Sequence, residues 1–318
     1  MPKLAACDVI LMTFSVGECI REDIVDLRRA LNAAGVTTRA LVLTERPDIV
    51  YPVDLEVVQC EPGSKLKKIK SQLSGDNPFI CVIDSDMRLK LPVCKELVLR
   101  AMSESAGITF GLIESSSVPG SMGNCIQLDK RWSHRFLRPA LHFCGVGITV
   151  PGQFVVYSPR LLATINDGTD TFLDDLYFGL KCRQQGLGIL RINKIVGYEE
   201  GRSGWSGLLL QRIRWMKGLF RLTRDAWTGG AGWSYCIIHY LAYHGLPIAY
   251  VAFILALILS HHGATALCLI IAFLAVFATV TRSLSPALLL YAAAFPILHA
   301  VATLGALLPF SIKNLRRR

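Results

Sequence analysis

The first 83 residues alternate short apolar runs with amphipathic or polar segments. The run at 9–16 lies between Asp8 and Glu18 and predicts a buried β-strand, and the helical pattern at 20–34 ends at Gly35. Further strands are predicted at 39–44, 55–60 and 78–83, with a basic helix at 65–73. This alternation predicts an α/β fold in which helices cover parallel strands. Ligands bind such sheets at the carboxyl ends of the strands, so the residues after each apolar run are the candidates for chemistry.

Three long apolar runs, at 236–260, 264–281 and 286–310, build the end of the chain. A helix needs roughly 20 apolar residues to cross a bilayer. The runs carry no polar stripe, which disfavours the alternative of buried helices in a soluble protein. The connectors at 261–263 and 282–285 are long enough only for tight turns. We therefore expect about three transmembrane helices.

The basic tail creates a conflict about membrane topology. Three crossings would place Lys313 and residues 316–318 on the side opposite the N-terminal region, whereas basic segments favour the cytosolic side. The first apolar run contains His239, His244 and Pro247, which are compatible with a partly interfacial or re-entrant segment. The side on which the tail lies is left open.

Charge is distributed unevenly along the chain. All 24 acidic residues precede residue 231, together with 29 of the 34 basic residues, so the first 230 residues carry a net charge of +5. This distribution excludes a wholly soluble enzyme, a disordered chain and a fibrous protein. It predicts a cytosolic α/β domain at 1–205, an amphipathic interfacial helix at 206–232 and a membrane region at 233–318.

Two features favour a cytosolic location for the N-terminal domain. The first apolar run is short, is flanked by acidic residues and lacks the cleavage site of a signal peptide. The ten cysteines form no C-x-x-C pair and have no histidine at metal-ligand spacing, which is typical of reduced core residues. The expected location is the plasma or inner membrane, with this domain on the cytosolic side.

The strand predicted at 78–83 ends at Asp84-Ser85-Asp86. Period-two alternation would put Asp84 and Asp86 on one side and Ser85 on the other. Two carboxylates so close repel each other unless a cation lies between them. Mg²⁺ and Mn²⁺ are commonly held by one or two carboxylates together with substrate phosphates. The alternative interpretation is a solvated turn, and the position at the end of a buried strand favours the metal site.

A second acidic pair, Asp174-Asp175, precedes apolar residues at helical spacing and is expected to open a helix. Helix capping explains such a pair without any chemistry. A functional role for one carboxylate would be that of a general base near a reacting hydroxyl. Taken alone, the pair favours capping.

The stretch at 208–222 is basic and amphipathic and lies just before the membrane region. At helical spacing Gln211, Arg214 and Trp215 share one face, whereas Arg212 and Lys217 point elsewhere. An interfacial helix on anionic lipid explains the pattern. The functional alternative uses Arg214 to hold a diphosphate and the Trp215 ring as a platform for a sugar.

These three motifs, in this order and beside a membrane region, resemble the membrane-embedded family-2 glycosyltransferases of GT-A fold. That family includes cellulose, hyaluronan and chitin-oligosaccharide synthases and, more distantly, ceramide glucosyltransferases. The resemblance covers about residues 7–310. It implies a Rossmann-like nucleotide-sugar domain followed by transmembrane helices, an inverting transfer from a UDP-sugar, and a divalent metal.

The resemblance also implies residue roles. Asp84 and Asp86 match the metal and nucleotide-sugar motif, with Asp86 as the main ligand of Mg²⁺ or Mn²⁺. Asp175 matches the catalytic base, and Asp174 lies beside it on the acceptor side.

The remaining roles implied by the resemblance concern the donor and the acceptor. Gln211, Arg214 and Trp215 match the family's Q-x-x-R-W motif, which frames the diphosphate and the acceptor. Lys67 or Lys68 matches a basic position near the nucleotide.

The chain also departs from the family pattern. Where relatives recognise the base with an Asp after the second strand, this chain offers Glu45 or Asp48. Gly152 and Gln153 precede a strand predicted at 154–157 and lie where the family lines the acceptor mouth. The acidic pair is Asp-Asp where Glu-Asp is commoner.

The acceptor has two candidates. The Q-x-x-R-W motif favours a growing β-linked poly- or oligosaccharide. Three apolar helices cannot readily enclose a polar channel, which favours a ceramide-like or carrier lipid that receives a single sugar. A third hypothesis is a non-enzymatic membrane protein with a nucleotide-sensing domain. The expected partners are the donor, the acceptor and the bilayer, with homo-oligomerisation left open and no nucleic acid expected.

Overall fold

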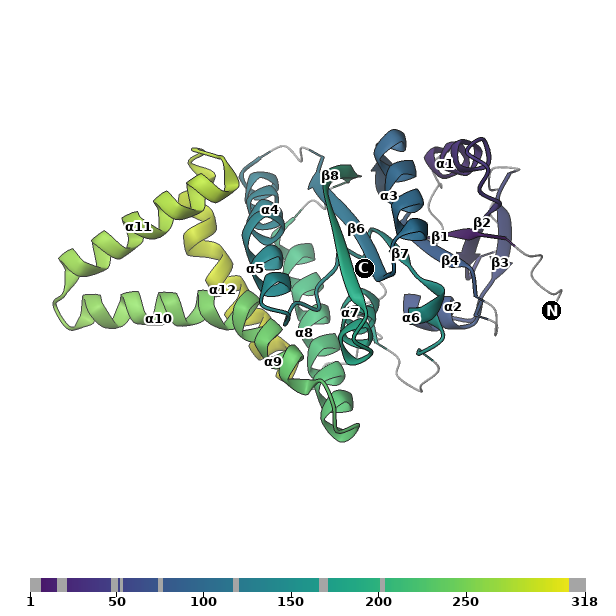
Figure 1. Ribbon diagram of the computed structural model, residues 1–318. Coiled ribbons are helices and arrows are strands. Elements are labelled where there is room, and N and C mark those ends of the chain that lie inside the picture. The colour runs from purple at the N-terminus through teal and green to yellow at the C-terminus, as the bar shows by residue number, and fades with distance from the viewer. Residues whose placement is uncertain are drawn as a thin grey trace. The chain divides into compact units, whose positions relative to one another are not determined.

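The computed structural model describes residues 7–15, 22–46, 51, 54–73, 77–116, 120–165, 171–200 and 204–308. The chain divides into two compact units, one made of Met1–Glu114 with Ile148–Glu200 and one of Ser115–Gly147 with Gly201–Arg318 (Figure 1). Residues 115–147 thus group with the C-terminal helices, although they lie between two segments of the first unit in the sequence.

The first unit is built on a mixed sheet with strand order β3-β2-β1-β4-β7-β6-β8-β5. The strands are β1 (Val9–Ser15), β2 (Thr38–Thr44), β3 (Glu56–Gln59), β4 (Phe79–Asp84), β5 (Met87–Leu89), β6 (Ala106–Ser115), β7 (Phe154–Tyr157) and β8 (Gly188–Glu199). Strands β3, β2, β1 and β4 pair in parallel, which confirms the prediction for the first 83 residues. By contrast, β7 is antiparallel to β4 and β6, and β5 is antiparallel to β8, so the whole sheet is mixed.

The helices of the first unit are α1 (Asp23–Asn32), α2 (Lys65–Lys70), α3 (Leu91–Ser103), α6 (Pro159–Leu162) and α7 (Asp174–Gln184). Helices α1 and α3 bury Leu27, Leu31 and Leu97 in one core with Val9 and Leu11 of β1. This apolar core holds the carboxyl ends of β1, β2 and β4 at one edge of the sheet, because parallel strands end on the same side.

The second unit is helical among its described residues. Its elements are α4 (Ser121–Trp132), the π-helical turn η1 (Ser133–Leu137), α5 (Arg138–Phe143), α8 (Trp205–Thr228), α9 (Trp233–Tyr240), the π-helical turn η2 (Leu241–Gly245), α10 (Leu246–Leu259), α11 (Gly263–Thr281) and α12 (Ala287–Leu307). The helix predicted at 208–222 is confirmed and extends further in both directions.

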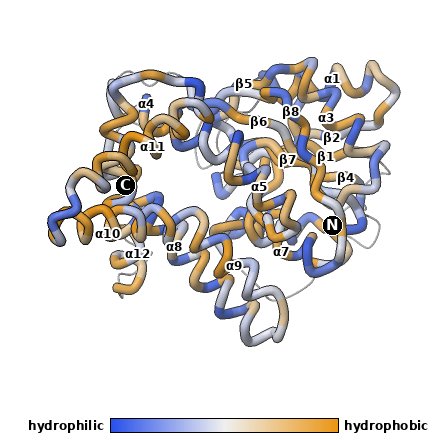
Figure 2. The backbone as a smooth tube through the Cα atoms, turned by 60° about the vertical axis from the view of Figure 1, so that its left-hand side comes forward, coloured by the Kyte–Doolittle hydropathy of each residue, from blue (hydrophilic) through white to orange (hydrophobic). Residues whose placement is uncertain are grey.

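Three helical segments are long and apolar enough to cross a membrane: Trp233–Leu259, Gly263–Thr281 and Ala287–Leu307. They confirm the three apolar runs, and the predicted end of the third run lies outside the described residues. Figure 2 shows that hydrophobic residues dominate α10 and α11 as they do the central strands. Apolar side chains of the central strands are buried, whereas those of α10 and α11 are largely exposed.

Candidate functional site

A partly buried ammonium group joins three segments at the carboxyl edge of the sheet. Nζ of Lys65 donates to Oδ1 of Asp84 at 2.7 Å and to the carbonyl oxygen of Gly152 at 2.9 Å. The same nitrogen lies 3.5 Å from Oδ2 of Asp174. One cation therefore connects the end of β4, the turn before β7 and the first residue of α7. We call Lys65, Asp84, Asp174 and the adjacent Asp175 the carboxylate cluster.

The start of α2 directs Lys65 toward this cluster. Ser64 caps the helix, because its hydroxyl oxygen accepts the backbone N–H of Lys67 at 3.0 Å. Leu66 and Ile69 are fully buried, which fixes the rotation of the short helix. The Lys65 ammonium also lies 5.2 Å from the centre of the Phe14 ring, at the end of β1.

The carboxylate cluster has more negative than positive charge. Burial lowers the pKa of Lys65, but the carboxylates of Asp174 and Asp84 outweigh burial, and the net shift is upward. Burial raises the pKa of Asp174, which the Lys65 ammonium opposes and the Asp84 carboxylate reinforces. One lysine thus offsets only part of the charge of Asp84, Asp174 and Asp175, and the cluster is suited to a further cation.

Asp86 lies in the turn between β4 and β5. Strand β4 ends at Asp84, so period-two alternation does not fix the direction of the Asp86 side chain. The carbonyl oxygen of Asp86 accepts the N–H of Glu200 at 3.0 Å, and its side-chain Oδ1 is buried. Carboxylate oxygens are the hard donors that Mg²⁺ and Mn²⁺ prefer, so Asp84 and Asp86 fit such an ion. Among the described residues, no three His, Cys, Asp or Glu side chains gather into a metal centre.

The two acids at 174–175 open α7, as predicted. The N-cap is Leu173, which forms no side-chain cap, and Oδ1 of Asp175 accepts the N–H of Leu176 at 2.8 Å. Asp175 thus contributes to the helix terminus, whereas the carboxylate of Asp174 contacts Lys65. The capping interpretation therefore accounts for Asp175 in part and does not account for the burial of Asp174.

The turn at Gly152-Gln153 is packed against the acidic helix start. A Cβ atom at Gly152 would lie 3.2 Å from Cβ of Asp175, which is tight for any side chain. The carbonyl oxygen of Gln153 accepts the N–H of Asp84 at 2.9 Å, and its side-chain amide donates to Oε2 of Glu199 at 3.0 Å. These bonds hold the turn between β4 and β8, directly beside Asp175.

The basic residues named from the sequence occupy other positions on α2. Nζ of Lys68 is buried and lies 2.9 Å from Oε1 of Glu45. Lys67 is exposed and pairs with Glu61 at 3.0 Å. Sequence reasoning did not single out Lys65, although helical spacing places Lys65 and the buried Lys68 on the same side of α2. Asp48 lies outside the described residues.

The three residues of the Q-x-x-R-W motif lie half-buried on α8, in the second unit. Helical spacing predicted that Arg212 lies on another face than Trp215. The Arg212 guanidinium group lies over the Trp215 ring, with the guanidinium carbon 4.5 Å from the ring centre. Arg212 also donates to Oδ2 of Asp129 at 2.6 Å, and the Tyr291 hydroxyl donates to Oδ1 of Asp129 at 3.0 Å. We call Asp129, Arg212, Trp215 and Tyr291 the arginine network.

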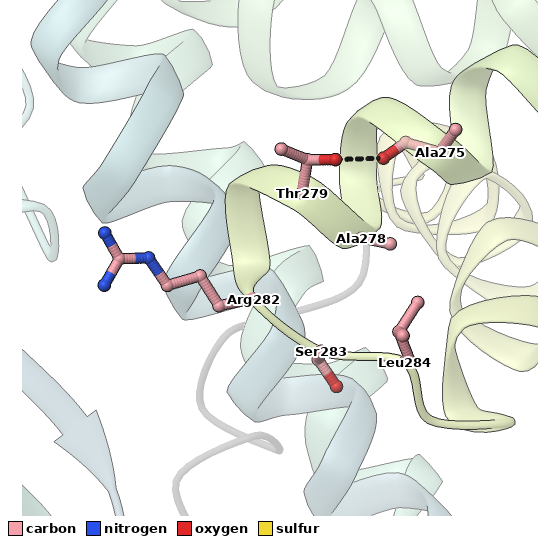
Figure 3. A pocket seen from close by; sticks show the side chains of 6 residues that line it. All are labelled: Ala275, Ala278, Thr279, Arg282, Ser283 and Leu284. Carbon is pink, nitrogen blue, oxygen red and sulfur yellow. Dashed lines mark hydrogen bonds between the residues drawn. The ribbon is translucent and has the colours of Figure 1, made fainter.

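A cavity of about 600 Å³ lies at the C-terminal end of α11, again in the second unit. It is lined by Ala275, Ala278, Thr279, Arg282, Ser283 and Leu284 (Figure 3). The Thr279 hydroxyl donates to the backbone carbonyl of Ala275 at 2.8 Å, so the walls are apolar apart from Arg282 and Ser283. None of the predicted site residues lines this cavity.

The family model described as glycosyl transferase family group 2 matches residues 79–300, which is more than half of the chain. The chain belongs to that family. It is a glycosyltransferase, as the motifs predicted, and the alternative of a non-enzymatic membrane protein is set aside. A search of curated protein sequences gives no match.

One solved structure agrees with this family at the level of the fold, and a second is similar to part of the chain only. A mannosyltransferase from Pyrobaculum calidifontis, in complex with GDP-mannose and Mn²⁺, is 15% identical, with 99% of this chain and 89% of that chain covered and a TM-score of 0.53. A glucosyl-3-phosphoglycerate synthase from Mycobacterium tuberculosis, in complex with Mn²⁺, UDP-glucose and phosphoglyceric acid, is 19% identical over 68% of this chain and 79% of that chain, with a TM-score of 0.46. The N-terminal unit of the glycosyltransferase has the GT-A fold.

Proposed function

We propose that this glycosyltransferase transfers a sugar, with inversion, from a nucleotide-diphosphate sugar to an acceptor hydroxyl at the membrane surface. The observation that carries the proposal is the carboxylate cluster at the carboxyl edge of the sheet, where Lys65 offsets only part of the charge of three carboxylates. A UDP-sugar is the proposed donor, and the GDP-mannose of the archaeal relative makes a GDP-sugar the competing donor.

Asp175 is the proposed general base. It lies at the second position of α7, beside the turn at Gly152-Gln153, where an acceptor hydroxyl would approach. As the hydroxyl oxygen attacks the anomeric carbon, its proton passes to the Asp175 carboxylate, and the bond to the diphosphate breaks. A single displacement of this kind converts an α-linked donor into a β-linked product.

Asp86 and Asp84 are the proposed ligands of Mg²⁺ or Mn²⁺, which when bound would neutralise charge on the departing diphosphate. Lys65 keeps Asp84 and Asp174 in place through its two contacts and offsets part of their repulsion. Lys68 with Glu45 and the exposed Lys67 are the proposed contacts for the nucleotide. The roles of Gln211, Arg214 and Trp215 stay predictions from the family resemblance.

A growing poly- or oligosaccharide is the first candidate acceptor, because the Q-x-x-R-W motif is typical of such synthases. A membrane lipid is the second candidate, and one observation favours it. The helices α10 and α11 expose mainly apolar side chains, such as Phe253, Leu259 and Leu267, and carry no charged residue to line a path for a polymer.

The test measures nucleotide release by the purified protein in detergent against a panel of UDP- and GDP-sugars, with and without Mg²⁺ or Mn²⁺. We expect metal-dependent release with one donor, and loss of release in Asp175→Asn by about 100-fold or more, with donor binding retained. Asp26→Asn, a change of the same type on the exposed face of α1, is the matched control. Equal release by Asp175→Asn and the wild type would contradict the assignment, and product size distinguishes a chain from a lipid.

A further inference from the structure

The last apolar helix of the glycosyltransferase, α12, lies along two charged helices. Near its start, the Cys125 thiol of α4 donates to the Ala287 carbonyl oxygen at 3.7 Å, and Tyr291 bonds to Asp129 of α4 at 3.0 Å. Near its end, Gly305 packs closely against Ile213 of α8, because a Cβ atom added to Gly305 would lie 3.0 Å from the Ile213 side chain. We call α4 and α8 the charged platform, and α12 contacts it at both ends.

The charges on the platform prevent it from entering the bilayer core beside α12. Helices α4 and α8 carry nine charged residues: Asp129, Lys130, Arg131, Arg212, Arg214, Lys217, Arg221, Arg224 and Asp225. A single Asp, Lys or Arg at the centre of a membrane helix costs about 2.5 to 3.5 kcal/mol. Helix α12 has 21 residues, is about 31 Å long and lies against this platform. It could therefore cross the bilayer only if the platform crossed with it.

The hairpin of α10 and α11 has the opposite character. Residues 246–281 contain no Asp, Glu, Lys or Arg, and Figure 1 shows that the turn between α10 and α11 lies away from the rest of the unit. The C-terminal end of α11 packs against α4, where the ring of Phe277 lies 4.8 Å from that of Trp132. Large apolar side chains are exposed on both helices: Phe253, Leu255, Ile258, Leu259, Leu267, Ile271 and Val276. Helix α11 has 19 residues, about 28 Å, which matches the roughly 30 Å of a bilayer core. Helix α10 has 14 residues and reaches this length only together with α9 and η2, in the apolar segment Trp233–Leu259.

The positions of basic and aromatic residues mark the two ends of this hairpin. Its connection at 260–263 contains no Lys or Arg, whereas Arg282, beside the cavity of Figure 3, follows the C-terminal end of α11. The rings of Trp227 and Trp233, 4.8 Å apart, lie where the chain leaves α8 for the membrane, and tryptophans are typical of the membrane interface. Arg282 and the two tryptophans therefore lie on the side of the membrane from which the hairpin enters, which we call the entry side.

We infer that the chain crosses the bilayer twice, by the segment Trp233–Leu259, which ends in α10, and by α11, and that α12 lies at the entry-side surface on the charged platform. The described residues before Trp233 contain no candidate span, so the N-terminal unit is on the entry side. The tail with Lys313 and residues 316–318 is then on the same side, in agreement with the preference of basic segments for the cytosol. This topology does not depend on the donor or the acceptor.

Thiol labelling in sealed membrane vesicles tests this topology. In a background with Cys7, Cys19, Cys60, Cys144 and Cys268 changed to Ser, three single variants are compared: Ser103→Cys in the first unit, His262→Cys in the hairpin connection and Asn314→Cys in the tail. A membrane-impermeant maleimide is applied to vesicles of each orientation. Labelling after detergent addition shows that each thiol is reactive.

We expect Ser103→Cys and Asn314→Cys to be labelled from the same side, and His262→Cys from the other side, with at least a tenfold preference in each case. Labelling of Asn314→Cys from the side opposite Ser103→Cys would overturn the inference, because α12 would then cross. Labelling of His262→Cys from the Ser103→Cys side would also overturn it, because the hairpin would then not cross.

Discussion

Each unit of the glycosyltransferase contains a partly or fully buried cation, and the two cations have different surroundings. In the carboxylate cluster, Lys65 contacts Asp84 and Asp174, with Asp175 close by. In the arginine network, Arg212 contacts one carboxylate, Asp129, whose other oxygen is bonded to Tyr291. The first arrangement has an excess of negative charge and the second is balanced.

The difference distinguishes the proposed site for chemistry from a structural connection. Neighbouring carboxylates repel each other unless another cation or a proton relieves them, so the cluster gains by binding a ligand. A balanced pair gains little from a ligand, and this one joins α4, α8 and α12. Variants of the cluster should therefore change activity, whereas variants of Asp129 and Tyr291 should change stability.

The largest effect is expected from Asp84→Asn. The change removes one charge from the proposed metal site and weakens the contact with Lys65, and we expect kcat/KM to fall about 100-fold. The measurement is nucleotide release as a function of metal concentration, in which the variant should need more metal. Full activity at unchanged metal dependence would show that Asp84 is not a ligand.

Lys65→Met should have an intermediate effect with a specific pH signature. The carboxylates raise the pKa of Lys65 and, by reciprocity, its ammonium makes them easier to ionise. Removal of the ammonium favours their protonated forms, so the acidic limb of the pH–rate profile should move to higher pH, with kcat reduced about tenfold.

Lys194→Met is the matched control for this prediction, because Lys194 of β8 has an exposed side chain that pairs with Glu96 of α3 and has no proposed role in binding. Its pH profile should match that of the wild type. A profile of Lys65→Met that keeps its acidic limb in place would mean that the ammonium does not act on the carboxylates.

Asp129→Asn should act on stability rather than on activity. The change leaves the Arg212 guanidinium without its carboxylate in a largely buried position, which should cost about 3 kcal/mol. The melting temperature in detergent should fall, whereas kcat per folded molecule should stay within twofold of the wild type. A variant that melts normally but is inactive would reverse the roles of the two regions.

Tyr291→Phe is expected to have the smallest effect. It removes one hydrogen bond to Asp129 and keeps the aromatic packing of Tyr291 with Phe277 and Phe295, so the loss should be about 1 kcal/mol. A melting temperature lower than that of Asp129→Asn would show that Tyr291, not the ion pair, holds the network together.

The local apolar pattern was sufficient to predict the strands and helices that carry the acids. It predicted β4, which ends at Asp84, β7 at 154–157 and the start of α7 at Asp174, because burial determines how apolar residues are spaced along these segments. It could not select Lys65 among the lysines of α2, because the partners Asp84 and Asp174 are distant in the sequence.

Tertiary packing also explains what the sequence did not predict in the second unit. Hydropathy treats α12 like α10 and α11, because it does not register that one face of α12 is covered by α4 and α8. The grouping of residues 115–147 with the C-terminal helices depends on the same contacts. The antiparallel strands β7 and β8 have pairing partners that the alternation of strands and helices does not specify.

The central claim is that the carboxylate cluster carries out sugar transfer and that the ion pair of Asp129 and Arg212 does not. The most direct test compares the wild type, Asp175→Asn and Asp129→Asn in one nucleotide-release assay, with the preferred donor, saturating metal and equal amounts of folded protein. We predict that release by the wild type and Asp129→Asn is similar and that release by Asp175→Asn is at least about 100-fold lower. Undiminished release by Asp175→Asn, or loss of release by Asp129→Asn alone, would contradict the account.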